Sequence, residues 1–322
     1  MTVDTLVRPA PIAIVGSPTA LGGHFAGMEG GPNALRGARL LERLGLRGGL
    51  GGAQIIDQGD VPNQPGWVAD PDPLMKNRDR IIAYLPKLAE QVERVLGPRS
   101  DAILDPKLLL LGGDCTSHAA AMAGFKRRSP EARIAIAWFD AHGDFNTPTT
   151  TPSGNVWGMP FAMLCGRGDE GLVAACDGPT VKEEDAALIG GQVLDELESR
   201  MLAGSAVAHF GAGMVAGVAG MAALEAWARI IGQRCDGLYI AFDLDAIDAS
   251  ESLSVAMPER AGISIWTAII AVRLLAAHNN VVGFGATAAM IRPGLDIQKT
   301  ADVVAQLTEA ALGAPVAVAA EA

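Results

Sequence analysis

Short apolar runs alternate along the chain with longer segments that mix apolar and polar residues. Each run ends in glycine, aspartate or another polar cluster. The runs occupy 11–18, 53–60, 107–114, 133–144, 205–213, 237–248 and 279–288. Continuous apolar runs of this length are typical of strands buried on both faces of a parallel sheet. The longer segments between them predict crossover helices.

The predicted helices follow from amphipathic spacing and from turn residues at their ends. One covers 30–45, with Pro32 near its first turn, and another covers 78–97, with charged residues on its outer face. A third begins within 153–168. A closing helix lies in 300–322, before an Ala-rich end that we expect to fray. The stretch 176–204 predicts a solvated loop followed by another connection, and Glu183, Glu184 and Asp185 in it predict a solvated acidic patch. Neither a repeat nor a linker separates two halves, so we expect one doubly wound α/β domain over 1–322, with a core of about 11–312 and ligands beyond the carboxyl ends of the strands.

Composition narrows the class of protein. Hydrophobic residues make up 49% of the 322 positions, and the net charge of −11 argues against a nucleic-acid partner, since no basic patch is visible. Apolar stretches are too short for a membrane helix, and the N-terminus lacks a basic start and a cleavage site. Four irregularly spaced cysteines make no disulfide framework. We therefore expect a reduced, cytoplasmic protein without a membrane partner, in which Cys165, Cys176 and Cys235 are packing residues.

Two strand ends carry clustered acidic groups. Asp140, His142 and Asp144 lie at i, i+2 and i+4, a period that directs side chains of an extended segment to one side. Asp243 and Asp245 repeat the i, i+2 spacing at another strand end. Burying several carboxylates together is costly unless cations neutralise them, and oxygen ligands with an imidazole suit a divalent metal such as Mn²⁺. Five ligands are too many for one ion with open positions, which favours two ions about 3.5–4 Å apart over aspartates that only cap helices and form turns.

These segments resemble the arginase–agmatinase (ureohydrolase) family. The similarity includes "VGSPTALGGHFAGMEGGPNALR", "GGDCTSH", "WFDAHGDFN", "NTPTTTPSGNVWGMP" and "IAFDLDAIDAS", and it extends from about residue 11 to 300. The fourth of these segments is most similar to the arginase branch. The resemblance implies a three-layer α/β/α sandwich, a homo-oligomer (trimer or hexamer) and hydrolysis of a guanidine or related C–N bond by a hydroxide that bridges two Mn²⁺ ions.

The resemblance assigns roles to individual residues. Asp140, His142, Asp144, Asp243 and Asp245 match metal ligands, with Asp140 and Asp243 matching the bridging carboxylates. Cys115 occupies the position of a histidine ligand in the family. It could ligate as a thiolate, leave one ion weakly held as a neutral thiol, or serve as inert packing; we expect coordination. A nucleophilic role ranks last, because Cys115 lacks a convincing base.

The substrate residues match only in part. Asn146, Thr151 and Ser153 match residues that bind the α-carboxylate of an amino-acid substrate. Trp157, however, replaces a histidine thought to shuttle protons, and indole is a donor only. Ala288 lies near the place of a glutamate that anchors the guanidinium, and no aspartate is found near Met214, where we place the family's contact with the substrate amino group. These changes favour a modified, less basic guanidine over L-arginine, such as the N-hydroxyarginine on which altered family members act.

The mechanism implied by the resemblance has metal-bound hydroxide attack the guanidine carbon while Asp144 accepts its remaining proton. The group that protonates the departing amine is open, with His24, His118 and His209 as candidates. The alternative is a catalytically impaired family member that acts as a binding or assembly subunit. Retention of five ligands argues against complete decay, because carboxylates without cations would destabilise the fold.

Overall fold

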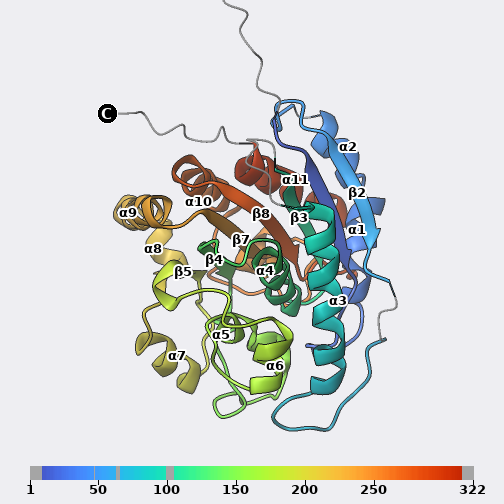
Figure 1. The fold of residues 1–322 in the computed structure, drawn as a ribbon, viewed down its shortest axis with the longest axis vertical. Helices are drawn as coiled ribbons and strands as arrows, with labels where there is room; N and C mark the ends of the chain where they lie inside the picture. Colours follow the sequence, from blue (N-terminus) through green and yellow to red (C-terminus); the bar gives the residue numbers. More distant parts are fainter. Residues whose placement is uncertain (1–8, 47, 63–65, 99–104, 314–322) are drawn as a thin grey trace, which may run out of the picture.

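Eight parallel strands form one central sheet in the computed structural model, which describes residues 9–46, 48–62, 66–98 and 105–313. The strands are β1 (Ile12–Ser17), β2 (Ile55–Asp60), β3 (Lys107–Gly112), β4 (Ile134–Asp140), β5 (Ala186–Gly190), β6 (Ala208–Gly211), β7 (Gly237–Asp243) and β8 (Val281–Thr287). Their order across the sheet is β2-β1-β3-β8-β7-β4-β5-β6 (Figure 1). Seven of the eight lie in the predicted apolar runs.

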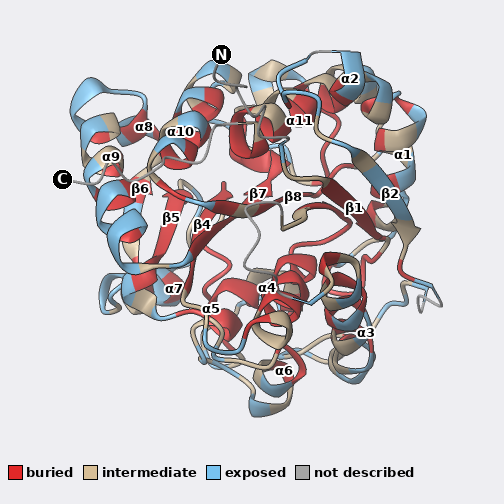
Figure 2. Ribbon diagram, turned by 45° about the horizontal axis from the view of Figure 1, so that its top comes forward, coloured by how far each residue is buried: buried red, intermediate tan, exposed pale blue. Residues whose placement is uncertain are grey.

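Helices cover both faces of the sheet, as Figure 2 shows. One side carries α1 (Gly31–Gly37), α2 (Leu40–Leu46), α8 (Ala212–Val215), α9 (Val218–Arg234), α10 (Ile265–His278) and α11 (Ile297–Leu312). The other carries α3 (Arg78–Leu96), α4 (Thr116–Arg128), α5 (Pro160–Leu164), α6 (Glu170–Ala175) and α7 (Glu196–Ala203). Alternate residues of β4 belong to two separate core clusters, Phe139 to one and Trp138 to the other. The predicted three-layer α/β/α arrangement is confirmed.

The acidic stretch before β5 differs from the prediction of a solvated loop and patch. Asp185 is buried, and its carboxylate lies 2.7 Å from Nε of Arg133 and 2.7 Å from Nε of Arg234. Two guanidinium groups thus replace the water that an isolated carboxylate would require. The patch interpretation was therefore wrong for Asp185, and the five apolar residues that follow it form β5.

The helices depart from the prediction in three places. The segment 30–45 forms two helices, α1 and α2, because Arg39 between them has a left-handed backbone with φ of 64°. The segment 153–168 contains a 3₁₀ turn over Val156–Gly158 and only the short helix α5. The sequence pattern does not single out α9 and α10, since α10 is apolar on most sides and shows little 3.6-residue contrast. The predicted fraying at the C-terminal end falls on 314–322, outside the described residues.

The strand order places the candidate ligands together. β3, β8, β7 and β4 are consecutive neighbours, so the loops that follow their carboxyl ends share one edge of the sheet. Polar residues after β3, β7 and β4 therefore meet although more than one hundred positions separate the first from the last. No helix in the described part of the chain is long and apolar enough to cross a membrane.

Candidate metal centre

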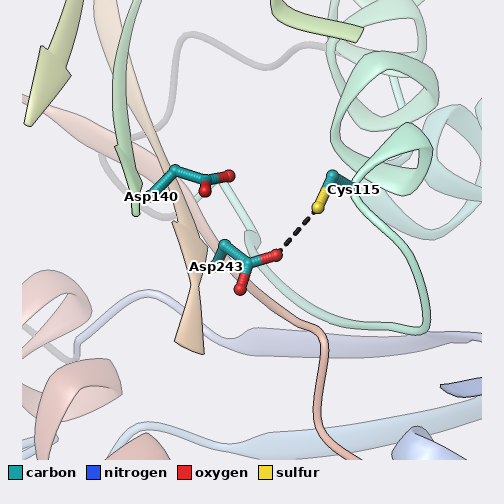
Figure 3. Close-up of side chains that lie close together, drawn as sticks. All are labelled: Cys115, Asp140 and Asp243. Atoms are coloured by element: carbon teal, nitrogen blue, oxygen red, sulfur yellow. Dashed lines mark hydrogen bonds between the residues drawn. The ribbon is translucent and has the colours of Figure 1, made fainter. Parts of the chain in front are cut away.

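The first group of candidate ligands joins three elements. Cys115 precedes the first turn of α4, Asp140 is the last residue of β4, and Asp243 is the last residue of β7. The thiol Sγ of Cys115 lies 2.8 Å from Oδ2 of Asp243, and one ligand atom from each residue falls within 4.8 Å of the other two (Figure 3). All three side chains are buried. A thiol and two carboxylates thus converge on one point.

A second group shares Asp140 with the first. His142 Nδ1 lies 3.2 Å from Oδ1 of Asp140 and 3.2 Å from Oδ2 of Asp245. The other oxygen of Asp245 accepts a hydrogen bond from the backbone N–H of Ala141 at 3.1 Å, which fixes the carboxylate. Because Asp140 belongs to both groups, the two candidate positions are adjacent.

The electrostatics of these groups reflect crowded, buried anions. Burial, reinforced by neighbouring carboxylates, raises the pKa of Asp140 to about 6 and raises the pKa values of Asp144 and Asp243 further above normal. Burial also raises the pKa of the Cys115 thiol, and Asp243 adds to the effect. Burial opposes a charged imidazole at His142, but Asp245 and Asp140 outweigh it and raise the pKa of His142. Cations would relieve this repulsion.

The chemistry and geometry of the donor set fit divalent cations. Asp144 has a left-handed backbone with φ of 47°, an uncommon conformation for a residue with a side chain. Its Oδ2 atom is buried and has no hydrogen-bond partner among the described residues, and the same is true of Oδ1 of Asn146. Buried oxygens without partners are costly unless another group binds them. Oxygen, imidazole and thiol donors together suit transition-metal ions.

A cavity of about 280 Å³ opens onto the candidate ligands. Its polar lining includes Asn146, Thr151, Ser153 and Asp195. Most of its apolar lining belongs to one small hydrophobic cluster, which includes Met28, Ala256 and Ala288, with Trp157 and Met257 packed against them. The cavity therefore offers polar groups and an apolar surface beside the acidic centre.

The predicted substrate residues line the cavity, where some also stabilise its loop. Asn146 Nδ2 donates to Oδ2 of Asp195 at 2.9 Å. Thr151 Oγ1 accepts from the backbone N–H of Gly154 at 3.0 Å, and Ser153 Oγ accepts from that of Asn155 at 3.3 Å. These bonds form turns, which is the structural role that such residues commonly have.

Only one of the three histidines considered as proton donors lines the cavity. His24 lines the cavity, and its ring packs edge-on against Trp157. Partial burial of the imidazole, followed by the charge of nearby Lys76, lowers the pKa of His24. His118 is fully buried behind the centre, and His209 hydrogen-bonds the backbone carbonyl of Gly190 at 3.2 Å. Neither of the latter two lines the cavity.

Sequence reasoning missed two carboxylates of the site. Asp195 and Glu198 line the cavity from the start of α7, whereas Met214, where the substrate amino contact was expected, does not. Glu198 is buried, and its Oε1 accepts from the backbone N–H of Phe145 at 2.9 Å. The signal was present, because Asp195-x-x-Glu198 forms a helix capping box. That pattern predicts a helix start but does not show where in the fold the helix lies.

The cysteines other than Cys115 lie outside the cavity lining. All four are free, and burial raises the pKa of Cys165 to about 12 and that of Cys235 to about 11. Thiols in such environments are poorly reactive. Their predicted packing role agrees with this environment.

Comparison with known proteins supports the resemblance. The sequence model of the Arginase family matches residues 10–313. The arginase of Bacillus subtilis (strain 168) is 31% identical over 305 residues, which cover 94% of this chain and 97% of that protein. The crystal structure of arginase from Bacillus caldovelox superposes with a TM-score of 0.81 at 30% identity, covering 95% of this chain and 99% of that one. Proclavaminate amidino hydrolase from Streptomyces clavuligerus shares the fold, with a TM-score of 0.70 at 19% identity over 95% of this chain and 92% of that one. The chain therefore belongs to the arginase family and is an arginase-like amidinohydrolase.

Proposed function

We propose that the protein hydrolyses a C–N bond in a guanidino amino acid whose head group is modified, with an N-hydroxyguanidine preferred over L-arginine, and that it uses two Mn²⁺ ions. The observation that carries this proposal is the pair of donor groups sharing Asp140, set beside a cavity with both polar and apolar surfaces. Family membership supports hydrolysis of guanidino compounds.

The donor atoms divide naturally between two ions. Cys115, Asp140 and Asp243 would hold one, and Asp140, His142 and Asp245 would hold the other. The family resemblance adds Asp144 to the first set and Asp243 to the second. Divalent ions in such a site supply Lewis acidity and lower the pKa of water. The thiol of Cys115 makes the first site softer than the second, so the two sites differ in metal preference.

The polar lining would orient the amino-acid part of the substrate. The amide of Asn146 and the hydroxyls of Thr151 and Ser153 can donate hydrogen bonds to a carboxylate. Asp195 can accept from an ammonium group. Asp144, whose Oδ2 has no hydrogen-bond partner among the described residues, is the group we assign to accept the proton of the attacking water. The water oxygen bonds to the guanidine carbon, the bond from that carbon to the chain nitrogen breaks, and His24 is the candidate donor to the departing amine.

The apolar lining favours a less basic head group. A guanidinium placed against Trp157, Met257 and Ala288 would lose water without gaining a carboxylate partner from those residues. An N-hydroxyguanidine is less basic and can enter as the neutral form. Its hydrolysis would release the amine and hydroxyurea, and hydrolysis of an unmodified guanidine would release urea.

The test is a substrate panel with protein loaded with Mn²⁺. L-Arginine, Nω-hydroxy-L-arginine, agmatine and formiminoglutamate would be compared by chromatography of the released products. We expect kcat/KM to be at least about tenfold higher for the hydroxyguanidine, a difference of about 1.4 kcal/mol. Asp140→Asn should abolish turnover, while Asp236→Asn, at the opposite end of β7, should not. Binding of Mn²⁺ without hydrolysis of any panel member would refute the proposal and favour a binding or assembly subunit.

A further inference from the structure

A chain of buried hydrogen bonds extends behind Asp243, away from the cavity. The phenol oxygen of Tyr239 lies 2.9 Å from His118 Nδ1. His118 Nε2 lies 3.1 Å from Oγ1 of Thr287, and that hydroxyl lies 3.3 Å from Oδ2 of Asp243. Tyr239, His118 and Thr287 are fully buried, come from β7, α4 and β8, and are not among the candidate metal ligands.

An ionised Asp243, which is the form that binds a metal ion, fixes the direction of every bond. A carboxylate can only accept, so the single proton of Thr287 is donated to Asp243. Thr287 must then accept from His118, which requires the proton of a neutral imidazole to be on Nε2. His118 is neutral because burial lowers its pKa to about 3. With Nε2 protonated, Nδ1 can only accept, and its donor is the O–H of Tyr239. All three protons therefore point toward Asp243.

Packing leaves the ring of His118 little freedom to change this arrangement. Trp138 contacts it edge-on, with ring centroids 5.1 Å apart, and the indole N–H of Trp138 donates to Oδ2 of Asp140 at 3.1 Å. A Cβ at Gly285 would lie 2.2 Å from the oxygen of Tyr239 and 2.8 Å from His118 Nδ1. Glycine is thus required at 285 for the imidazole and phenol to meet.

We propose that Tyr239, His118 and Thr287 are positioning residues. Together they form a relay of hydrogen bonds that all point toward Asp243, and the hydroxyl of Thr287 holds Asp243 opposite Cys115 by donating its proton to the carboxylate of Asp243. The consequence for metal binding rests on the proposed metal centre. The contacts of the relay do not, since they are present in the protein without metal. The two parts can therefore be tested separately.

The first measurement is the tautomer of His118 in protein loaded with Zn²⁺, which is diamagnetic and binds Asp243 only as a carboxylate. Two-bond ¹H–¹⁵N correlation spectra distinguish Nε2–H from Nδ1–H imidazoles, and the chain has only five histidines. Loss of one spin system in His118→Gln assigns the signal. We expect the Nε2–H form, without a protonated imidazole, down to pH 5. An Nδ1–H tautomer in the Zn²⁺-loaded protein, or protonation at pH 5, would overturn the relay.

The second measurement is Mn²⁺ affinity, from the electron paramagnetic resonance signal of free Mn²⁺ during titration. Thr287→Val removes the donor to Asp243, and we expect binding of the more weakly held ion to weaken about tenfold or more. Thr287→Ser keeps the hydroxyl and should restore most of the affinity. Equal binding by wild type and Thr287→Val would contradict the proposal. Failure of wild-type protein to bind Mn²⁺ would instead refute the proposed function and leave the tautomer result standing.

The third measurement uses the only two tyrosines of the chain as a matched pair. Both are buried, and Tyr84 hydrogen-bonds Ser17 Oγ at 2.7 Å, outside the relay. Tyr239→Phe removes the donor that selects the tautomer, so the Nδ1–H form should become detectable and Mn²⁺ binding should weaken by a few-fold. Tyr84→Phe should change neither. Identical spectra and affinities for the two variants would show that Tyr239 does not act through His118.

Discussion

Replacing Glu198 by alanine tests how the start of α7 supports the loop that carries Asp144 and Asn146. Glu198 is 3% exposed. Its Oε1 accepts from the backbone N–H of Phe145 at 2.9 Å, and its Oε2 accepts from that of Asp195 at 3.1 Å. The side chain therefore connects the first turn of the helix to the residue between the two site residues.

The expected loss of stability follows from these contacts. The buried N–H of Phe145 loses its acceptor, which costs about 1–3 kcal/mol. Loss of half of the capping box at α7 adds roughly 0.5–1 kcal/mol. Removal of a poorly solvated carboxylate offsets part of this, since burial raises the pKa of Glu198 to about 7. We therefore expect the free energy of unfolding to decrease by about 2 kcal/mol. We also expect kcat to fall by a larger fraction of its wild-type value than the free energy of unfolding does.

The assay is equilibrium urea unfolding of metal-free protein, with Glu196→Ala as the control. Glu196 lies in the same turn of α7 but is exposed and pairs with Arg200, which is also exposed. Removal of such a surface pair costs less than about 0.5 kcal/mol. Equal losses for the two variants would refute the argument that Glu198 acts through the backbone of the site loop.

Three further predictions concern single residues. Cobalt-loaded wild type should show a sulfur-to-metal charge-transfer band that Cys115→Ser lacks and Cys165→Ser retains; a band in all three would exclude Cys115 as a ligand. Asp185→Asn should lower the free energy of unfolding by about 2 kcal/mol. This is less than the cost of breaking a fully buried ion pair, because Arg133 and Arg234 are each 33% exposed. The control Glu184→Gln should lower the free energy of unfolding by less than about 0.5 kcal/mol. For His118, the native pKa of about 3 lies below the unfolded value of about 6.5, so stability falls as pH falls below 6.5. Wild type should lose about 2 kcal/mol more than His118→Gln between pH 7 and 5, and parallel stability curves would refute this.

Local pattern was sufficient for most of the fold. Interior strands such as β1, β3, β4 and β7 could be predicted because each is a continuous apolar run that ends in a polar cluster, which is how a strand buried on both faces appears in sequence. The edge strands β2 and β6 have shorter apolar runs and are half-buried or exposed at most positions. The apolar run of β5 is short, and the apolar and polar faces of α10 differ little. The sequence pattern therefore did not predict either element. The burial of Asp185 was missed because its two arginine partners, Arg133 just before β4 and Arg234 at the end of α9, are far away in the chain.

The candidate site divides in the same way. Local spacing was enough to identify the residues with metal-binding chemistry, since the i, i+2 spacing of Asp140 and His142, and of Asp243 and Asp245, is a property of the local backbone. Only the tertiary structure decided that Cys115 meets Asp243, that Glu198 supports the loop of Asp144, and that a relay from Tyr239 ends at Asp243. These contacts depend on which strands are neighbours, and the order β3-β8-β7-β4 is set by the packing of crossover helices over the whole sheet, which no local pattern encodes.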